Sequence, residues 1–143
     1  MSSSIAVFGS INMDLVIFSQ NKPSEGETIF GSSFHTFQGG KGANQAVAAS
    51  RLEIDVSFIG KIGVDVFGKQ LRDNLIEENI NVEYLEEHNS ESGVAFINVF
   101  EKTSENQIIV VPGANSYVES NQVPDELLSS TDILISQLEI PPN

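Results

Sequence analysis

The segment Gly39-Gly40-Lys41-Gly42-Ala43-Asn44-Gln45-Ala46-Val47-Ala48-Ala49 passes from a glycine turn directly into an alanine-rich stretch with helical character. Glycine lets the backbone come close to a ligand, because no Cβ stands in the way. The first turn of a helix offers free N–H groups and a partial positive charge to an oxygen-rich ligand. Lys41 and Asn44 would add side-chain donors. We therefore expect a small polar molecule to bind here; the alternative is a tight strand-to-helix turn with Lys41 solvated.

On both sides of this turn the sequence alternates between strand and helix patterns. Continuous apolar runs that stop at glycine are typical of buried parallel strands, and apolar residues three and four apart are typical of amphipathic helices. The predicted elements are a strand over 5–8, a helix over 41–52, a strand over 56–59, a helix over 65–79 capped by Asp65, a short helix after 121 and a buried strand over 133–138. This order indicates the α/β class with a parallel sheet.

Two other segments, 13–38 and 93–112, have a different character. Both are extended and more polar than the predicted core strands. Within the second segment, 93–100 and 107–111 flank a polar turn, which is the pattern of a hairpin. We expect these segments to form a small accessory sheet beside the main one.

The composition excludes several classes of function. Acidic residues outnumber basic ones 20 to 7, which gives a formal net charge of −13 over 143 residues. Such a surface disfavours nucleic acid and anionic membranes, so we expect neither as a partner. The absence of cysteine excludes disulfides, zinc–thiolate sites and cysteine nucleophiles. The chain shows no signal-peptide pattern and no apolar run near the ~20 residues that span a bilayer, so we expect a cytoplasmic protein.

Polar side chains follow two of the predicted strands. Asn12 and Asp14 come just after the strand 5–8, and in an extended segment a spacing of two points both side chains the same way. Glu139 comes just after the strand 133–138. Open α/β sheets bind ligands at the carboxyl ends of their strands, and an amide beside a carboxylate can hold vicinal hydroxyls. The plainer alternatives are loop residues that cap backbone groups and an ordinary exposed glutamate.

Other motifs favour plainer interpretations. The chain contains neither a G-x-x-x-x-G-K-[ST] loop nor a G-x-G-x-x-G fingerprint. Gly113-Ala114-Asn115 follows a predicted strand and is more typical of a turn than of a second backbone approach to the ligand. Gln137 has the character of an ordinary polar residue. His35 and His88 have no carboxylate or serine at a spacing that suggests a catalytic triad.

Several motifs, in order, resemble those of the ribokinases, a group within the PfkB family of sugar kinases. The most specific is G-G-K-G-A-N-Q-A over 39–46, which goes beyond the glycine pair of the wider family. The others are Gly9-Ser10-Ile11-Asn12-Met13-Asp14, Gly26-Glu27-Thr28, Gly60-Lys61-Ile62-Gly63-Val64-Asp65-Val66-Phe67-Gly68, Pro112-Gly113-Ala114-Asn115 and Gln137-Leu138-Glu139. The resemblance covers essentially all 143 residues.

The resemblance implies a ribokinase-like doubly wound parallel sheet, incomplete in this chain, with a small β-sheet lid over a sugar. Residues 1–143 would be the N-terminal, sugar-binding part of one kinase domain, and the lid strands would fall within 13–38 and 93–112. Members of the family often dimerise through the lid. The implied contacts to D-ribose are Asn12, Met13, Asp14, Gly39, Gly40, Lys41, Gly42, Ala43, Asn44 and Glu139.

The activity that the resemblance implies is phosphoryl transfer from ATP to D-ribose with Mg²⁺, giving ADP and D-ribose 5-phosphate. In the family, the metal-linked N-x-x-E segment, the G-A-G-D anion hole with its catalytic base and the nucleotide pocket lie in a second half that has no counterpart here. We therefore expect no catalytic residue and no determinant for ATP or Mg²⁺ in this chain, and no turnover by it alone. The alternatives are another PfkB sugar kinase, a non-catalytic sugar-binding or interaction fragment, and an incomplete gene product.

Overall fold

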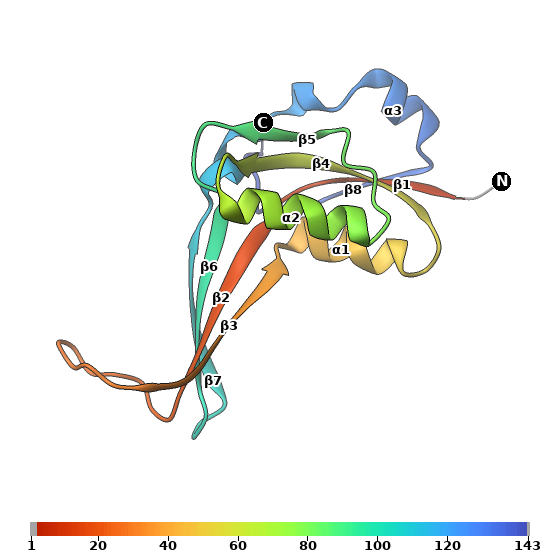
Figure 1. The fold of residues 1–143 in the computed structure, drawn as a ribbon. Coiled ribbons are helices and arrows are strands. Elements are labelled where there is room, and N and C mark those ends of the chain that lie inside the picture. Colours follow the sequence, from red (N-terminus) through yellow and green to blue (C-terminus); the bar gives the residue numbers. More distant parts are fainter. Residues whose placement is uncertain (1–2, 143) are drawn as a thin grey trace.

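The computed structural model describes residues 3–142, so residues 1, 2 and 143 of the predicted domain lie outside the described residues. The strands form two four-stranded sheets. One sheet is layered with the helices, and we call it the core sheet; the other extends away from the helices as an arm, and we call it the outer sheet (Figure 1). The α/β class predicted from the sequence is confirmed.

The core sheet is parallel throughout, with the strand order β5-β4-β1-β8. Its strands are β1 (Ser4–Phe8), β4 (Asp55–Gly63), β5 (Leu85–His88) and β8 (Ile133–Ser136). The two inner strands, β1 and β4, bury most of their side chains, as expected for a parallel sheet with helices on its faces. The predicted strands 5–8 and 56–59 are confirmed, and the second of them continues to Gly63.

The helices lie on both faces of the core sheet, α1 and α2 on one and α3 on the other (Figure 1). Their bounds are α1 (Lys41–Ser50), α2 (Val66–Glu77) and α3 (Asp125–Ser130), with two 3-10 helices, η1 (Gly113–Tyr117) and η2 (Ser120–Gln122), before α3. The main core lies between α1, α2 and the sheet and includes Phe58, Leu71 and Leu75. Asp65 caps α2 as predicted, because its side chain accepts a hydrogen bond from Gly68 N at 2.7 Å.

The outer sheet has the order β3-β2-β6-β7 and mixes strand directions. Its strands are β2 (Asn12–Ser19), β3 (Gly31–Gly39), β6 (Gly93–Phe100) and β7 (Glu105–Val111). The central pair, β2 and β6, is parallel, and each of these strands has an antiparallel neighbour on its other side. β6 and β7 form the hairpin predicted from the sequence. Every residue of β7, and every residue of β3 before Gly39, is exposed, so this sheet has little core of its own.

The strand predicted over 133–138 differs from its prediction in length and burial. β8 ends at Ser136, and its first two side chains, Ile133 and Leu134, are 53% and 47% exposed. The reason is its position: among the described residues β8 pairs only with β1, at the edge of the core sheet. An apolar run alone does not distinguish an inner strand from an edge strand.

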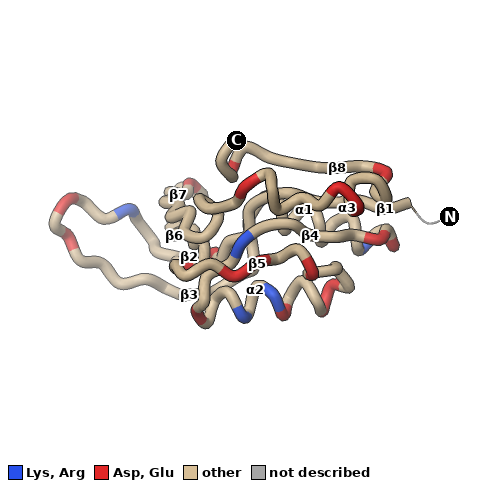
Figure 2. Tube along the Cα trace, turned by 90° about the horizontal axis from the view of Figure 1, so that it is seen from above, with Lys and Arg blue, Asp and Glu red and all other residues tan. Residues whose placement is uncertain are grey.

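Acidic residues outnumber basic residues, and they are spread over most of the structure. Acidic segments appear on the core layer and on the long turn between β2 and β3, whereas basic segments are few (Figure 2). In the part of the chain that the structure describes, no helix is both long enough and apolar enough to cross a membrane.

Candidate functional site

A hollow of about 180 Å³ lies where the outer sheet joins the core sheet and α1 begins. It is lined by Asn12, Asp14, Gly40, Lys41, Asn44 and Glu139, together with Ala95, Ile97, Ile108 and Val110. The first six are residues that the sequence predicts for the site. Asn12 and Asp14 follow the carboxyl end of β1, and Glu139 follows that of β8; these are adjacent parallel strands, and this is where open α/β sheets bind ligands. Gly40, Lys41 and Asn44 come from the turn after β3 and the start of α1.

The register of the outer sheet explains why the polar and apolar residues of the hollow meet. Asp14 of β2 is paired with Ala95 of β6, and Ala95 is paired with Val110 of β7. Paired residues share a face, and so do residues two apart in one strand, so Asn12 and Asp14 face the same way as the apolar residues of the lining. The outer sheet therefore supplies the hollow with an amide, a carboxylate and an apolar wall.

Each glycine of the 39–46 motif is required for a different structural reason. Gly40 has φ +92°, and a Cβ there would lie 2.7 Å from Ile11 Cα. A Cβ on Gly42 would lie 2.8 Å from the backbone of Ser10, so glycine lets α1 pack directly against the end of β1. A Cβ on Gly39 would lie 2.3 Å from Asp14 Oδ2, so Gly39 leaves room for the Asp14 carboxylate. The motif thus shapes both the turn and the hollow.

The start of α1 differs from the sequence-based expectation of free N–H groups. Lys41 N donates to Glu139 Oε2 at 3.1 Å, Gly42 N to Ser10 Oγ at 3.4 Å, and Ala43 N to Ser10 O at 3.0 Å. The next amide, Asn44 N, donates to Gly40 O within the helix. The first N–H groups of α1 are therefore not free as expected, because the chain satisfies these donors itself.

The carboxylate of Glu139 is bonded to Lys41 at the start of α1 and to Ser10. Its carboxylate accepts a hydrogen bond from Ser10 Oγ at 2.7 Å and forms an ion pair with Lys41 Nζ, in addition to its bond with Lys41 N. Burial would raise the pKa of Glu139, but the hydrogen bonds from Lys41 and Ser10 outweigh burial and hold that pKa below its ordinary value of 4.5. The alternative of an ordinary exposed glutamate is excluded.

Asp14 has the opposite environment. It is half-buried, and its carboxylate accepts no hydrogen bond from the described residues. Burial first, and the charge of Glu139 second, raise the pKa of Asp14 above its ordinary value of 3.8. The Asn44 side chain, on the exposed face of α1, likewise makes no hydrogen bond within residues 3–142. Two unpartnered polar groups therefore face the hollow.

Asn115 is a residue of this region that the sequence-based interpretation treated as a plain turn. It is 1% exposed, and its side chain bonds to Ile11 N, Ile11 O, Pro112 O and Asn12 Oδ1. It also lines a second cavity of about 230 Å³ that shares Asn12, Val110 and Glu139 with the first. The only signal in the sequence was the Pro112-Gly113-Ala114-Asn115 motif, which does not reveal which backbone groups the amide meets.

Four of the predicted site residues do not line the hollow. Met13 is fully buried in the main core, because alternate residues of β2 face opposite sides of the outer sheet. Ala43 is also buried in that core, and it contacts the site only through its backbone bond to Ser10. Gly39 and Gly42 contribute space, as described above. We therefore assign no side-chain contact with a ligand to Met13 or Ala43.

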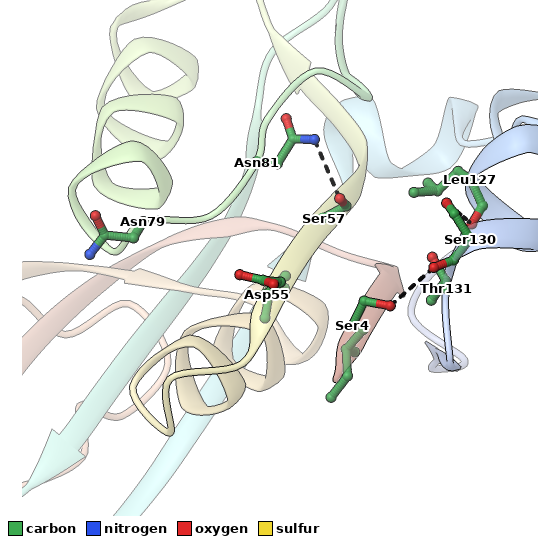
Figure 3. A pocket seen from close by; sticks show the side chains of 10 residues that line it. Ser4, Asp55, Ser57, Asn79, Asn81, Leu127, Ser130 and Thr131 are labelled. Carbon is green, nitrogen blue, oxygen red and sulfur yellow. Dashed lines mark hydrogen bonds between the residues drawn. The ribbon is translucent and has the colours of Figure 1, made fainter. Parts of the chain in front are cut away.

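Another hollow, of about 290 Å³, lies at the amino ends of β1 and β4, the opposite end of the core sheet (Figure 3). Figure 3 shows its small polar side chains, and some of them donate hydrogen bonds to side-chain or backbone oxygens of the same hollow. Ser4 Oγ donates to Ser130 O at 3.2 Å, and Asn81 Nδ2 donates to Ser57 Oγ at 3.4 Å. The residues predicted for the site do not line this hollow, so the candidate site is the one at the carboxyl ends.

Comparison with known proteins finds relatives along the whole chain. The family model described as pfkB family carbohydrate kinase matches residues 2–137. The ribokinase of Bacillus subtilis is 42% identical over 140 residues, which cover 96% of this chain and 47% of the relative. The chain thus spans about half the length of the curated relatives it matches.

Solved structures show the same relationship. The ribokinase of Thermotoga maritima superposes with a TM-score of 0.89 at 35% identity and covers 99% of this chain, which corresponds to 46% of that protein. The ribokinase of Arabidopsis thaliana, solved in complex with ribose and ATP, superposes with a TM-score of 0.86 at 32% identity over 99% of this chain and 47% of its own. The ribokinase-like fold expected from the sequence is confirmed. With a family model that matches nearly its whole length, this chain belongs to the pfkB family of carbohydrate kinases.

Proposed function

We propose that residues 1–143 form the sugar-binding part of a ribokinase-type enzyme, which transfers a phosphoryl group from ATP to D-ribose and releases ADP and D-ribose 5-phosphate. The observation that carries this proposal is the set of unpartnered polar groups in the hollow, Asp14 and Asn44, beside the apolar wall of the outer sheet. A sugar presents hydroxyls on its rim and C–H groups on its faces, and such a lining suits both.

The electrostatics of the hollow favour a neutral ligand. The first amides of α1 are already bonded to Ser10 and Glu139, and Lys41 Nζ is paired with Glu139. Asp14 adds a second carboxylate to the same cavity. A phosphate group would therefore meet repulsion without free backbone donors, whereas a hydroxyl can donate to Asp14 and accept from Asn44.

The roles of the lining residues follow from these contacts. The Asp14 carboxylate would accept hydrogen bonds from sugar hydroxyls, and its half-buried position strengthens such charge-assisted bonds. Glu139 would hold Lys41 and the start of α1 in place and add an acceptor at the rim. Together these groups would orient the hydroxyl that receives the phosphoryl group, and positioning supplies much of the rate enhancement in such reactions.

ATP and Mg²⁺ would be held by residues outside this hollow. Residues 3–142 contain no group of three or more His, Cys, Asp or Glu side chains arranged for a metal ion. The relatives that bind nucleotide, such as the Arabidopsis ribokinase solved with ATP, are matched over only 47% of their length. We therefore assign nucleotide and metal binding to the part of these enzymes that the present residues do not match, and no catalytic base to this chain.

The outer sheet would serve as a lid over the sugar and as the surface of a homodimer. Phe34, Phe96 and Ile109 lie on its face opposite the hollow and are 60%, 43% and 64% exposed. A contiguous apolar face of this kind is typical of an interaction surface. We also propose a cytoplasmic location, because the proposed reaction consumes ATP.

The test is sugar-dependent ADP release by the native protein that carries these residues, with MgATP and a panel of pentoses. We expect turnover with D-ribose and no acceptor activity with D-ribose 5-phosphate. Calorimetry on the 143-residue chain alone should show ribose binding, and the same chain should show no turnover. Absence of turnover and of binding with every pentose would refute the assignment, and turnover by the 143-residue chain would refute the placement of the phosphoryl-transfer groups.

A further inference from the structure

We propose that Asn115 is a positioning residue, which orients the side-chain amide of Asn12 so that Asn12 Nδ2 faces the hollow as a hydrogen-bond donor. The part of this inference that concerns the sugar rests on the proposed function. Asn115 lies in η1 and Asn12 opens β2, 103 positions apart in the sequence. The two amides nevertheless meet in the interior, where Asn115 is 1% and Asn12 is 5% exposed.

The backbone fixes which way the Asn115 amide points. Its Oδ1 accepts a hydrogen bond from Ile11 N at 3.0 Å, and its Nδ2 donates to Ile11 O at 3.1 Å and to Pro112 O at 2.9 Å. The reversed amide would set Oδ1 against two carbonyl oxygens and Nδ2 against an N–H group. Because backbone groups cannot exchange donor for acceptor, only one orientation of Asn115 satisfies its neighbours.

The fixed orientation of the Asn115 amide determines the orientation of the Asn12 amide. Asn115 Nδ2 also donates to Asn12 Oδ1 at 2.8 Å, and because an amide carries two N–H protons for these three acceptors, one proton is shared between two of them. The carbonyl oxygen of Asn12 is therefore the atom turned toward Asn115. Within residues 3–142 Asn12 Nδ2 donates to no protein group, and the only buried side-chain polar atom without a partner there is Gln137 Oε1. Asn12 Nδ2 is therefore not sealed in the interior, and Asn12 lines both the hollow and the adjoining cavity of about 230 Å³. We infer that Asn12 Nδ2 faces this continuous space.

The backbone of β6 leaves room for this contact. Gly93 is the register partner of Asn12, and a Cβ on Gly93 would lie 2.2 Å from Asn115 Nδ2 and 2.2 Å from Asn12 Oδ1. Any larger residue at position 93 would separate the two amides. The pairing of Asn12 with Asn115 thus requires three elements to coincide, namely the start of β2, the start of β6 and η1.

The consequence is a division of roles between two neighbouring residues on one face of β2. Asn12 turns its donor toward the hollow, because its oxygen faces Asn115, and an ionised Asp14 carboxylate offers only acceptors. A ligand that satisfies both needs one oxygen that accepts and one hydroxyl that donates. Adjacent sugar hydroxyls meet this requirement. The orientation of Asn115 thus determines which hydroxyl accepts a hydrogen bond from Asn12 Nδ2.

The first arm of the test needs no ligand. In the native protein that carries these residues, labelled with ¹⁵N, the heteronuclear NOE of the Asn12 side-chain amide should report a rigid group. In Asn115→Ala the same signal should report a mobile amide, because nothing then holds Asn12 Oδ1. The matched control is Gln122→Ala, which removes another buried amide; its Nε2 donates to Gly60 O, and neither Gln122 nor Gly60 lines the hollow. An unchanged Asn12 signal in Asn115→Ala would overturn the proposal.

The second arm is a double-mutant cycle on the KM for D-ribose. We expect Asn115→Ala to raise this KM about threefold to tenfold, the effect of one net hydrogen bond, with the KM for ATP unchanged. In an Asn12→Ala background the same substitution should change the ribose KM less than about twofold, because its route to the sugar is gone. Gln122→Ala should lower Tm without raising the ribose KM. Additive effects of the two asparagine substitutions would contradict the positioning role.

A third variant covers the case in which Asn115→Ala does not fold. Asn12→Asp has the same shape and still accepts from Asn115 Nδ2, but it offers the hollow no donor. We expect this variant to fold and to bind ribose more weakly; ribose binding equal to that of the unmodified protein would overturn the proposal. If the unmodified protein binds no pentose, the proposed function fails, and the NMR arm still decides whether Asn115 orients Asn12.

Discussion

The core sheet and the outer sheet have four strands each, yet they differ in what holds them together. The core sheet has helices on both faces, and its inner strands are buried. The outer sheet has an exposed edge strand on each side, and its buried residues are confined to the two central strands, apart from Gly39. Stability is therefore concentrated in the core sheet, and the outer sheet is free to carry residues chosen for contact with a ligand or a partner.

The largest expected effect concerns stability, and it should distinguish the two sheets directly. Phe58 of β4 is fully buried, so Phe58→Ala should lower the free energy of unfolding by about 3–5 kcal/mol. Phe34 of β3 is 60% exposed, so Phe34→Ala should change it by less than about 0.5 kcal/mol. Urea unfolding of both variants measures the difference. Equal losses in the free energy of unfolding would mean that Phe34 of the outer sheet stabilises the fold as much as a core residue does.

A second pair of variants concerns two glycines with positive φ. Gly40→Ala should cost roughly 2–4 kcal/mol, because φ is +92° and the new Cβ would lie 2.7 Å from Ile11 Cα. Gly26→Ala, in the turn between β2 and β3, should cost only about 1 kcal/mol. Its φ is +73°, but no atom lies within 4 Å of the added Cβ. Thermal melting compares the two, and a larger loss for Gly26→Ala would refute this explanation.

A third prediction separates binding from stability within the hollow. Asp14→Asn should weaken ribose binding by about 1.5–3 kcal/mol, the usual effect of losing a charge-assisted hydrogen bond. It should not lower Tm, because the carboxylate has no partner to lose among the described residues. Glu139→Gln should weaken binding less but lower Tm, because Glu139 accepts from Lys41 N and Ser10 Oγ. Calorimetry and melting together test both, and ribose binding unaffected by Asp14→Asn would remove Asp14 from the site.

The smallest effect is a shift with pH. The pKa of Asp14 is raised, so ribose affinity should fall on acidification with a midpoint above 3.8, and Asp14→Asn should abolish this step. The pKa of Glu139 is lowered, so its contribution to stability is fully present above 4.5 and is lost as the pH falls through its folded-state pKa, below that value. Binding should therefore weaken before this contribution to the fold is lost. Titration of ribose affinity and of Tm between pH 6 and pH 3 shows which of the two falls first on acidification. A loss of Tm at higher pH than the loss of ribose affinity would contradict this prediction.

The sequence predicts the local elements well, because their signals are local. Apolar runs that end at glycine mark β1 and β4, and Asp65 marks the start of α2. The rule that ligands bind at the carboxyl ends of parallel strands also places Asn12, Asp14 and Glu139 at candidate positions, but it leaves plainer roles open for each of them. Their joint role at one site is implied by the resemblance to the ribokinases, and the structure brings all three to one hollow.

The remaining features depend on contacts between distant residues, which leave no local pattern. Nothing near Lys41 indicates that Glu139 accepts its N–H, and nothing near Asn115 indicates that it meets Asn12. The exposure of β8 depends on which strand lies beside it, which an apolar run does not specify. Met13 is the reverse case: it lies inside a matching motif, but the alternation of β2 turns it into the core.

The bond between Lys41 and Glu139 has a consequence for how the protein is made. The two residues are 98 positions apart, which at the usual speed of ribosomes corresponds to roughly 5–20 s of synthesis. During that interval α1 can pack against β1, but its first turn lacks the carboxylate that completes it. The rim of the hollow would therefore be finished only after residue 139 has been made, and a nascent chain released before residue 139 would carry the fold of α1 without the finished rim.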